Sequence, residues 1–455
     1  MRPDGKNVSR LNTFIDNPEK GLWTLAVPIM AGMGVHTLYT IVDMLFIGRL
    51  GGESIAAVAY NMPLFFFVMG LTFGLGSGVT ASIARFIGAD DKVNADNSAE
   101  HAIAMAAVIS IILTGSGLLY GESILSFLGA KESILASSWS YLRFICYGLP
   151  CMIFSGFFRS ILSGEGDMKL PMIVTALGTV LNIILDPIFI FVLNFGVKGA
   201  AIATMISQVV VFLIFVYMLF IKEHSYIKFK LRDFSYSNLI LMEIIKVGLP
   251  ASISMVIMSF GQLVFNRILT DFSVDAVAAY QIGGRIDMVV FLPIMSIAAA
   301  MTTLVGMFYG AKEWIKMKSI IKYGITRSLM ITIVGSTLMI IFSPWIIKSF
   351  SSEPDIQDIA VYYLRCISLI YPLVAIGMSI GRILQGMGKG IPLLIITSIR
   401  ILVVSAPLAL FFIYGLGKPI EYVWYAMMIS TVVATTVAFF WLRYALNEIP
   451  TFKMN

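Results

Sequence analysis

Charged side chains are scarce in this sequence, and several long stretches contain none. Asp, Glu, Lys and Arg make up 13% of the 455 residues, whereas a soluble protein carries about 25%. Long uncharged runs include 54–84, 199–221, 247–266, 288–311, 328–347 and 422–442. Each has about 20 residues or more, enough to cross the ~30 Å hydrocarbon core of a bilayer as a helix. The shortage of charge therefore excludes a soluble globular protein.

Motifs that hold nucleotides, metals or catalytic groups are missing as well. The sequence has no GxxxxGK[ST] loop to cradle phosphates, no HExxH or CxxC pair and no nucleophile elbow. Its three cysteines, Cys146, Cys151 and Cys366, lack metal-ligand spacing and fall in apolar segments, so we interpret them as small buried side chains. We therefore expect no cofactor, no catalytic residue and no enzyme activity. Without a phosphate-cradling loop, ATP is not expected as an energy source.

The sequence contains many apolar segments of helix length, and its mean hydropathy is +0.89. In lipid, only helices and closed barrels satisfy their backbone polar groups, and these segments are continuously apolar rather than alternating. We predict an all-α polytopic membrane protein. Its twelve transmembrane helices are expected at about 21–47, 54–84, 101–121, 139–159, 170–193, 197–221, 243–268, 276–307, 323–343, 360–381, 391–414 and 422–444.

An internal repeat divides these helices into two sets of six. A single shift of the sequence along itself aligns FIGADD (86–91) with FYGAKE (308–313), YLRF (141–144) with YLRC (363–366), and ILSGEG (161–166) with ILQGMG (383–388). We predict two pseudo-symmetric six-helix bundles at 21–221 and 243–446. A cytoplasmic N-terminal segment (1–20), a cytoplasmic basic linker (222–242) and a cytoplasmic tail (447–455) complete the chain. Parallel repeats are typical of secondary transporters, whose substrate site lies between the halves and opens to each side in turn.

The distribution of positive charge predicts the orientation. With twelve spans, 23 of the 32 Lys and Arg residues fall on the side of the two termini, and 6 fall on the opposite side. Because cytoplasmic loops carry the excess of Lys and Arg, both termini are predicted to be cytoplasmic. The net charge of +6 follows mostly from this bias, so we expect no nucleic-acid partner.

One acidic residue stands out because it lies in the middle of an apolar helix. Asp186 occurs in LNIILDPIFIF (181–191), and Asn182 precedes it by four positions, so both share one helix face. Charged groups at this depth are costly and usually functional. Pro187 removes a backbone N–H beside Asp186 and permits a bend, and Pro28 in the first span is expected to act likewise.

The first span contains a second acid, Asp43 in TLYTIVDMLFIG. Tyr39 and His36 precede it by four and seven positions and share its face, so we expect them beside a substrate cavity. Thr204, in the sixth span, supplies a further hydroxyl oxygen. An alternative is that Asp43 is an ordinary helix-end charge close to Arg49.

These oxygens together predict a cation-coupling site made by Asp43, Asn182, Asp186 and Thr204. Two carboxylates, an amide oxygen and a hydroxyl suit Na⁺. They suit a proton equally well, because desolvation raises the affinity of a carboxylate for a proton. The sequence leaves both ions open.

The second half lacks the paired acids, since Phe265 and Ala406 stand where the first half has Asp43 and Asp186. It places polar residues in the seventh and eighth spans instead. Among these, Gln262 and Arg285 are predicted to line the substrate cavity, where Arg285 would face an acid of the first half. A snorkelling position for Arg285 is the alternative.

Taken together, these features resemble the multidrug and toxic compound extrusion (MATE) family, and most closely its DinF-like prokaryotic branch. The resemblance covers the whole chain, and its most specific motifs are TLYTIVD (37–43), LSGEGD (162–167), LNIILDPIFIF (181–191) and FGVKGAAIAT (195–204). It implies a monomeric exporter in the prokaryotic plasma (inner) membrane that exchanges amphipathic, often cationic, organic compounds for Na⁺ or H⁺. It also implies the first-half cation site named above and a bend at Pro28.

Two other functions remain as alternatives. One is a flippase for lipid-linked saccharides, from a related superfamily that shares the two-lobe architecture. Flippases of that kind tend to have cationic cavities, whereas the centred charges here are acidic. The other is a membrane-embedded enzyme or receptor, for which the sequence offers no catalytic motif.

Overall fold

The computed structural model describes residues 10–229 and 234–449, apart from the side chains of Tyr39 and Ser133. This part of the chain is helical and contains no β-strand. Eleven helices are long and apolar enough to cross a membrane, and the count is twelve if one bent helix pair is a single span. The predicted fold class, an all-α membrane protein of two six-helix bundles, is confirmed.

The N-terminal lobe follows the short helix α1 (Leu11–Asp16). Most of its helices extend beyond the predicted segments, because their polar ends continue past the apolar core. The N-terminal lobe consists of α2 (Pro18–Gly48), α3 (Gly52–Ala59), α4 (Met62–Gly88), α5 (Lys92–Phe127), α6 (Glu132–Gly164), α7 (Lys169–Pro187) and α8 (Val197–Val216). Short π-helical segments at Ile188–Val192 and Tyr217–Ile221 extend α7 and α8.

The C-terminal lobe begins earlier than predicted, since its first helix starts at Asn238. Its tenth span is not one straight helix but a pair of helices, α12 and α13, bent by 54° at a short break. The lobe consists of α9 (Asn238–Thr270), α10 (Val274–Gly310), α11 (Trp314–Lys348), α12 (Pro354–Ser368), α13 (Tyr371–Gly386), α14 (Ile391–Ser398), α15 (Ala406–Leu410) and α16 (Glu421–Asn447). Around α15, the backbone is π-helical at Ile399–Ser405 and Phe411–Gly415.

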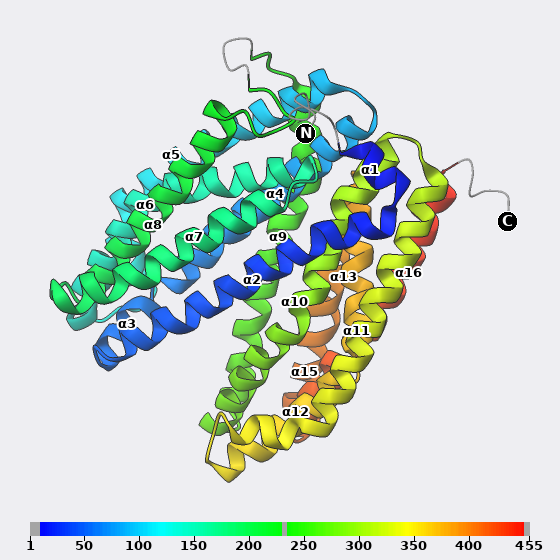
Figure 1. The fold of residues 1–455 in the computed structure, drawn as a ribbon. Coiled ribbons are helices and arrows are strands. Elements are labelled where there is room, and N and C mark those ends of the chain that lie inside the picture. Colours follow the sequence, from blue (N-terminus) through cyan, green and yellow to red (C-terminus); the bar gives the residue numbers. More distant parts are fainter. Residues whose placement is uncertain (1–9, 230–233, 450–455) are drawn as a thin grey trace.

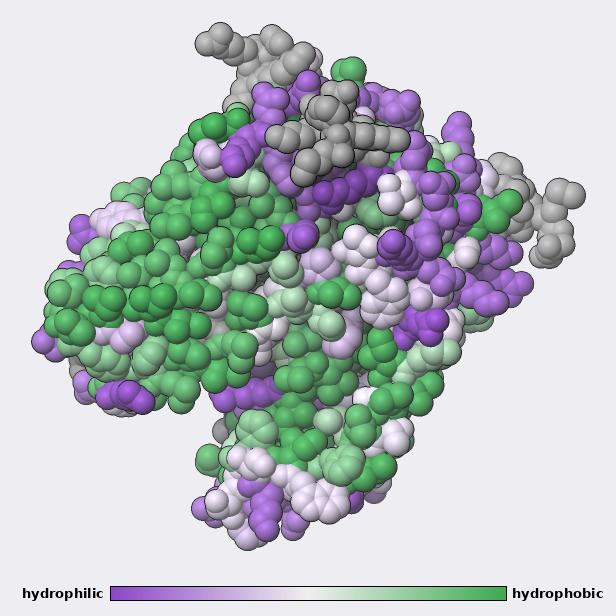
Figure 2. Space-filling model, viewed as in Figure 1, coloured by the Kyte–Doolittle hydropathy of each residue, from purple (hydrophilic) through white to green (hydrophobic). Residues whose placement is uncertain are grey.

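The two lobes form a V (Figure 1). They pack together at the end that carries α1 and the C-terminal end of α16, which we call the closed end. At the opposite, open end, α3 and α12 lie apart, and the space-filling view shows a hollow between the lobes (Figure 2). Contacts of α4 with α9 and α10, and of α2 with α10, join the lobes.

Close backbone packing holds the closed end together. A Cβ atom added to Gly88 of α4 would collide with the carbonyl oxygen of Met307, and one added to Gly310 of α10 would collide with that of Arg85. These glycines occupy equivalent places in the repeated FIGADD and FYGAKE motifs. Side chains larger than glycine would therefore keep α4 and α10 apart. Thr303 of α10 also donates a hydrogen bond to the carbonyl of Ser163, at the end of α6, at 3.0 Å.

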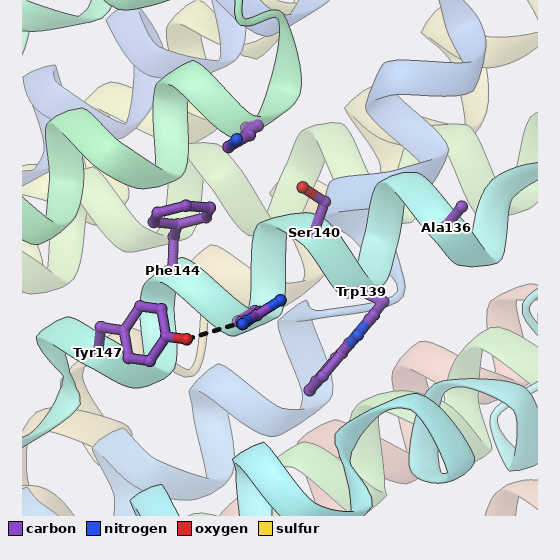
Figure 3. Close-up of a pocket in the computed structure, with 7 residues that line it drawn as sticks. Ala136, Trp139, Ser140, Phe144 and Tyr147 are labelled. Carbon is purple, nitrogen blue, oxygen red and sulfur yellow. Dashed lines mark hydrogen bonds between the residues drawn. The ribbon is translucent and has the colours of Figure 1, made fainter.

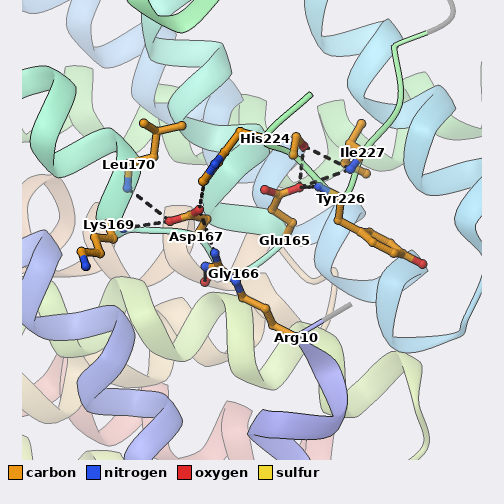
Figure 4. Close-up of polar contacts among 10 residues, drawn as sticks. Arg10, Glu165, Gly166, Asp167, Lys169, Leu170, His224, Tyr226 and Ile227 are labelled. Atoms are coloured by element: carbon orange, nitrogen blue, oxygen red, sulfur yellow. Dashed lines mark hydrogen bonds and ion pairs between the residues drawn. The ribbon is translucent and has the colours of Figure 1, made fainter. Parts of the chain in front are cut away.

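A polar junction at the closed end ties the start of the linker to the N-terminal lobe (Figure 4). Asp167, in the turn between α6 and α7, accepts hydrogen bonds from Arg10 at 2.8 Å and from His224 at 2.9 Å. Glu165 accepts from the Ser225 hydroxyl at 2.6 Å and from the Tyr226 backbone N–H at 2.9 Å. Both carboxylates are buried. We call Arg10, Glu165, Asp167, His224 and Ser225 the inner junction.

The two carboxylates of the inner junction respond oppositely to their surroundings. Burial raises the pKa of Glu165 to about 7, despite its hydrogen bond from Ser225. Burial also acts to raise the pKa of Asp167, but the hydrogen bonds and charge of Arg10, together with His224, outweigh it and hold that pKa below its usual range. Stabilisation by Asp167 is therefore present above its usual pKa and is lost in stronger acid.

Stabilisation by Glu165 depends on pH in the opposite direction to stabilisation by Asp167, and this difference can be tested. The folded protein binds the proton of the Glu165 carboxyl group more tightly than the unfolded chain does. The stabilisation that this proton gives the fold is therefore complete below the ordinary pKa of Glu and declines as pH rises through about 7. A pKa shift of this size corresponds to about 3 kcal/mol in the free energy of unfolding. We expect the melting temperature of the purified protein to fall between pH 5 and pH 8, and to fall less in Glu165→Gln. The exposed Glu19→Gln serves as control and should keep the wild-type slope. Equal slopes in all three proteins would contradict this account of Glu165.

A candidate cation site in the N-terminal lobe

Asp186 is completely buried near the end of α7, and Asn182 on the same helix is 3% exposed. The Asn182 amide bridges two helices. In the orientation that satisfies both of its polar groups, its nitrogen donates to Asp186 Oδ2 at 3.1 Å and its oxygen accepts from the Thr204 backbone N–H of α8 at 3.1 Å. The structure therefore brings three of the four predicted cation-site residues together, although Thr204 contacts Asn182 through its backbone.

The second carboxylate oxygen of Asp186 is chemically the most informative atom of the site. Oδ1 is buried and has no hydrogen-bond partner among the described residues. A buried carboxylate oxygen without a partner is costly. A bound cation or a proton on the carboxyl group would remove that cost, so the donor set fits either ion.

Asp43 on α2 lies within electrostatic range of Asp186 and is half-buried. Tyr141 of α6 lies within range of both carboxylates. Sequence reasoning did not identify Tyr141 as a site residue, because YLRF (141–144) served only to align the repeat. Four helices of the N-terminal lobe, α2, α6, α7 and α8, thus contribute to one acidic cluster.

The backbone next to Asp186 is irregular in the way that Pro187 suggests. Pro187 is the last residue of α7, and the π-helical segment Ile188–Val192 follows it directly. Proline removes one backbone donor from the helix ladder, and π-helical turns frequently occur at functional sites. By contrast, Pro28 lies inside α2, which is assigned as one helix from Pro18 to Gly48.

The described residues predicted to line a substrate cavity come from three helices, α2, α9 and α10. His36 of α2 is half-buried and lies within electrostatic range of Arg159. Gln262 and Arg285 are exposed, and Arg285 makes no ion pair within the described part of the chain. The side chain of Tyr39 lies outside the described residues. Among the described residues, the structure contains no group of three or more His, Cys, Asp or Glu side chains that could hold a metal ion.

The C-terminal lobe contains a buried acidic group that the sequence did not assign to a site. Asp287 of α10 accepts hydrogen bonds from Tyr363 of α12, at 2.7 Å, and from Tyr371 of α13. Both tyrosines are buried. Because both oxygens of Asp287 have tyrosine donors, this carboxylate is satisfied within the protein, unlike Asp186. The tyrosines come from helices that are distant in the sequence, so no local pattern could have revealed them.

Comparison with known proteins identifies the family. The MatE family model matches residues 28–188 and 250–411, so it matches once in each lobe and covers more than half of the chain. The chain belongs to the MatE family. This MATE protein is similar to the probable multidrug resistance protein NorM of Thermotoga maritima, with 29% identity over 92% of this chain and 90% of that protein.

Two further relatives agree with this assignment. The multidrug export protein MepA of Staphylococcus saprophyticus is 29% identical over 91% of both chains. A solved structure described as the outward-facing conformation of a multidrug resistance MATE family transporter superposes with a TM-score of 0.92 and 34% identity, covering 98% of this chain and all of the other. These relatives are transporters, so this MATE protein is a transporter rather than an enzyme. None of the three is described as a flippase for lipid-linked saccharides.

Proposed function

We propose that this MATE protein exports amphipathic organic cations from the prokaryotic cytoplasm in exchange for H⁺ or Na⁺ bound in its N-terminal lobe. The observation that carries the proposal is the buried Asp186 carboxylate, whose Oδ1 has no partner among the described residues. The names of the relatives NorM and MepA support multidrug export as the activity.

The V shape supports an alternating-access mechanism. With both termini in the cytoplasm, the closed end would face the cytoplasm and the open end the outside. The arrangement is therefore that of a transporter ready to release substrate outward and to take up its coupling ion. Ion binding at Asp186 and Asp43 would neutralise the acidic cluster and favour the conformation in which the other end opens.

The two candidate ions make different demands on the site. A proton needs only one carboxylate oxygen, and Asp186 Oδ1 is available for it. Na⁺ needs several oxygen ligands, which Asp186, Asp43 and the Asn182 amide would supply after a small movement. Either ion would relieve the repulsion between the two carboxylates.

The proposal is tested with purified protein in proteoliposomes. A cationic dye enclosed with the protein should leave faster under an imposed inward Na⁺ gradient or an imposed inward H⁺ gradient, and the arm that responds identifies the coupling ion. A protein that moves no dye under either gradient, but transfers lipid-linked saccharides between leaflets, would contradict the proposal and support a flippase.

Asn182 is expected to set the ion affinity of the site. Replacing it with Ala removes the hydrogen bond to Asp186 Oδ2, and hydrogen bonds to charged groups contribute about 1.5–3 kcal/mol. We expect Asn182→Ala to change the half-saturating ion concentration for efflux by about 10- to 100-fold. Asn266→Ala is the matched control, because Asn266 accepts a hydrogen bond from Gln281 in the C-terminal lobe. Equal shifts in both variants would argue against a specific role of Asn182.

A further inference from the structure

A pocket of about 340 Å³ lies on the N-terminal lobe, between α6 and the start of α8 (Figure 3). One face of α6 supplies Trp139, Ser140, Arg143, Phe144 and Tyr147, and the first turn of α8 supplies Lys198. Neither the proposed transport mechanism nor the cation site uses these side chains.

Two basic side chains converge on this pocket without an acidic partner. Arg143 and Lys198 form no ion pair with a carboxylate of the described residues. Arg143 Nε donates to the Tyr147 hydroxyl at 2.9 Å, which orients the guanidinium and leaves its other N–H groups available. Lys198 Nζ lies 5.1 Å from the centre of the Phe144 ring. The pocket therefore presents two oriented cations to any anion that enters it.

The position of the pocket points to the lipid headgroup region. The part of α6 that lines the pocket lies on the side of the N-terminal lobe away from the C-terminal lobe (Figure 1), whereas its last turn contacts α10. Lys198 is the second residue of a candidate span that begins at Val197, so it lies near one end of the hydrocarbon core. Trp139 and Tyr147 are residue types enriched at membrane–water interfaces. Tyr147 lines the pocket and is 43% exposed.

We propose that this pocket binds the phosphate group of an anionic phospholipid. Arg143 and Lys198 would contact the phosphate oxygens, and Trp139, Phe144 and Tyr147 would contact the glycerol backbone and the upper acyl chain. Arginine suits this role because its planar fork of donors matches phosphate geometry. The lipid would hold α6 and α8 together, the helices that carry Tyr141 and Thr204 of the acidic cluster.

The repeat provides an internal comparison. Arg365 of α12 is the counterpart of Arg143 in the aligned YLRC and YLRF motifs, and Lys418 precedes α16 much as Lys198 begins α8. At that place in the second lobe, however, the first residue of α16 is the acid Glu421. The second lobe thus offers the same two basic residue types with a carboxylate nearby, where an anionic lipid is not expected to bind as well.

The test uses full-length protein in nanodiscs of phosphatidylcholine and phosphatidylglycerol, with retained lipids counted by native mass spectrometry. The wild-type protein should retain phosphatidylglycerol with about tenfold higher affinity than Arg143→Gln/Lys198→Gln, which is ~1.4 kcal/mol and within the effect of two basic residues near anionic lipid. The single variant Arg143→Lys should keep part of this affinity, and Arg365→Gln/Lys418→Gln should match the wild type.

Three outcomes would overturn the proposal. An equal loss of phosphatidylglycerol affinity in the two double variants would show that overall charge, not the pocket, attracts the lipid. Equal retention in all proteins would show that the pocket binds no anionic headgroup. Displacement of phosphatidylglycerol by millimolar inorganic phosphate would assign the pocket to a free anion rather than a lipid. Each result is independent of dye efflux, so it distinguishes this proposal from the proposed function.

Discussion

Replacing Asp186 with Asn is expected to abolish gradient-driven efflux while leaving the fold intact. Asn keeps the shape of the side chain and an oxygen for the Asn182 amide, but it removes the charge that would bind the coupling ion. Neutralising a buried carboxylate also removes a desolvation cost, so we expect equal or higher thermal stability. Efflux of a cationic dye from proteoliposomes should fall to the rate of protein-free vesicles, a decrease of at least about 100-fold if ion binding is obligatory.

The matched control is Asp271→Asn, the same substitution at the C-terminal end of α9. Asp271 pairs with Arg267 at 2.6 Å and lies outside the acidic cluster. This variant should export dye at close to the wild-type rate. Gradient-driven efflux that survives in Asp186→Asn would show that the coupling ion binds elsewhere, and the carboxylate of Asp287 in the C-terminal lobe would then be the next candidate.

The second large effect is expected at the closed end, from Gly88→Ala. The added Cβ would collide with the Met307 carbonyl oxygen, so α4 and α10 must separate before the side chain fits. Overpacking typically costs about 1–3 kcal/mol, which would change the ratio of the two conformations by about 5- to 150-fold. We expect the lobes to part at the closed end, the open end to narrow and efflux to slow. Gly310→Ala should act in the same way, because its Cβ would collide with the Arg85 carbonyl oxygen.

Distance measurements between spin labels test this expectation. Labels placed at Glu53 of α3 and at Glu353 before α12 report the separation of the lobes at the open end. The distance should shorten in Gly88→Ala and stay at the wild-type value in Gly115→Ala, where an added Cβ meets no atom within 4 Å. An unchanged distance together with wild-type efflux in Gly88→Ala would show that close packing of α4 and α10 does not control the conformation.

Much of the fold could be predicted because membrane helices are long, uncharged and repeated. The six uncharged runs lie within candidate spans or extend only slightly beyond them. The two family matches begin at positions 28 and 250, and the same shift aligns the repeated motifs. The breaks were harder to predict. Hydropathy does not distinguish one straight helix from α12 and α13, which are bent by 54°, and it does not detect the π-helical turns.

The candidate site was predictable only where its residues are close in sequence. Asn182 and Asp186 are four positions apart, and this spacing correctly placed them on one face, where the amide and the carboxylate are hydrogen-bonded. Tyr141 could not be found in this way, because its place near the acids depends on how the helices of the N-terminal lobe pack together. The same limit applies to Gln262 and Arg285. Their polar character does not indicate which way their side chains face when the helices pack.

The central claim is that a cation bound at Asp186 drives export, and ion-dependent dye binding to the purified protein tests it most directly. When two binding sites are coupled, each ligand changes the affinity for the other by the same factor. An ion that drives export is therefore expected to lower the affinity for dye, and dye to lower the affinity for the ion equally. We predict that raising Na⁺ or lowering pH weakens dye binding to the wild-type protein and leaves binding to Asp186→Asn unchanged. The same ion dependence in both proteins would contradict the claim.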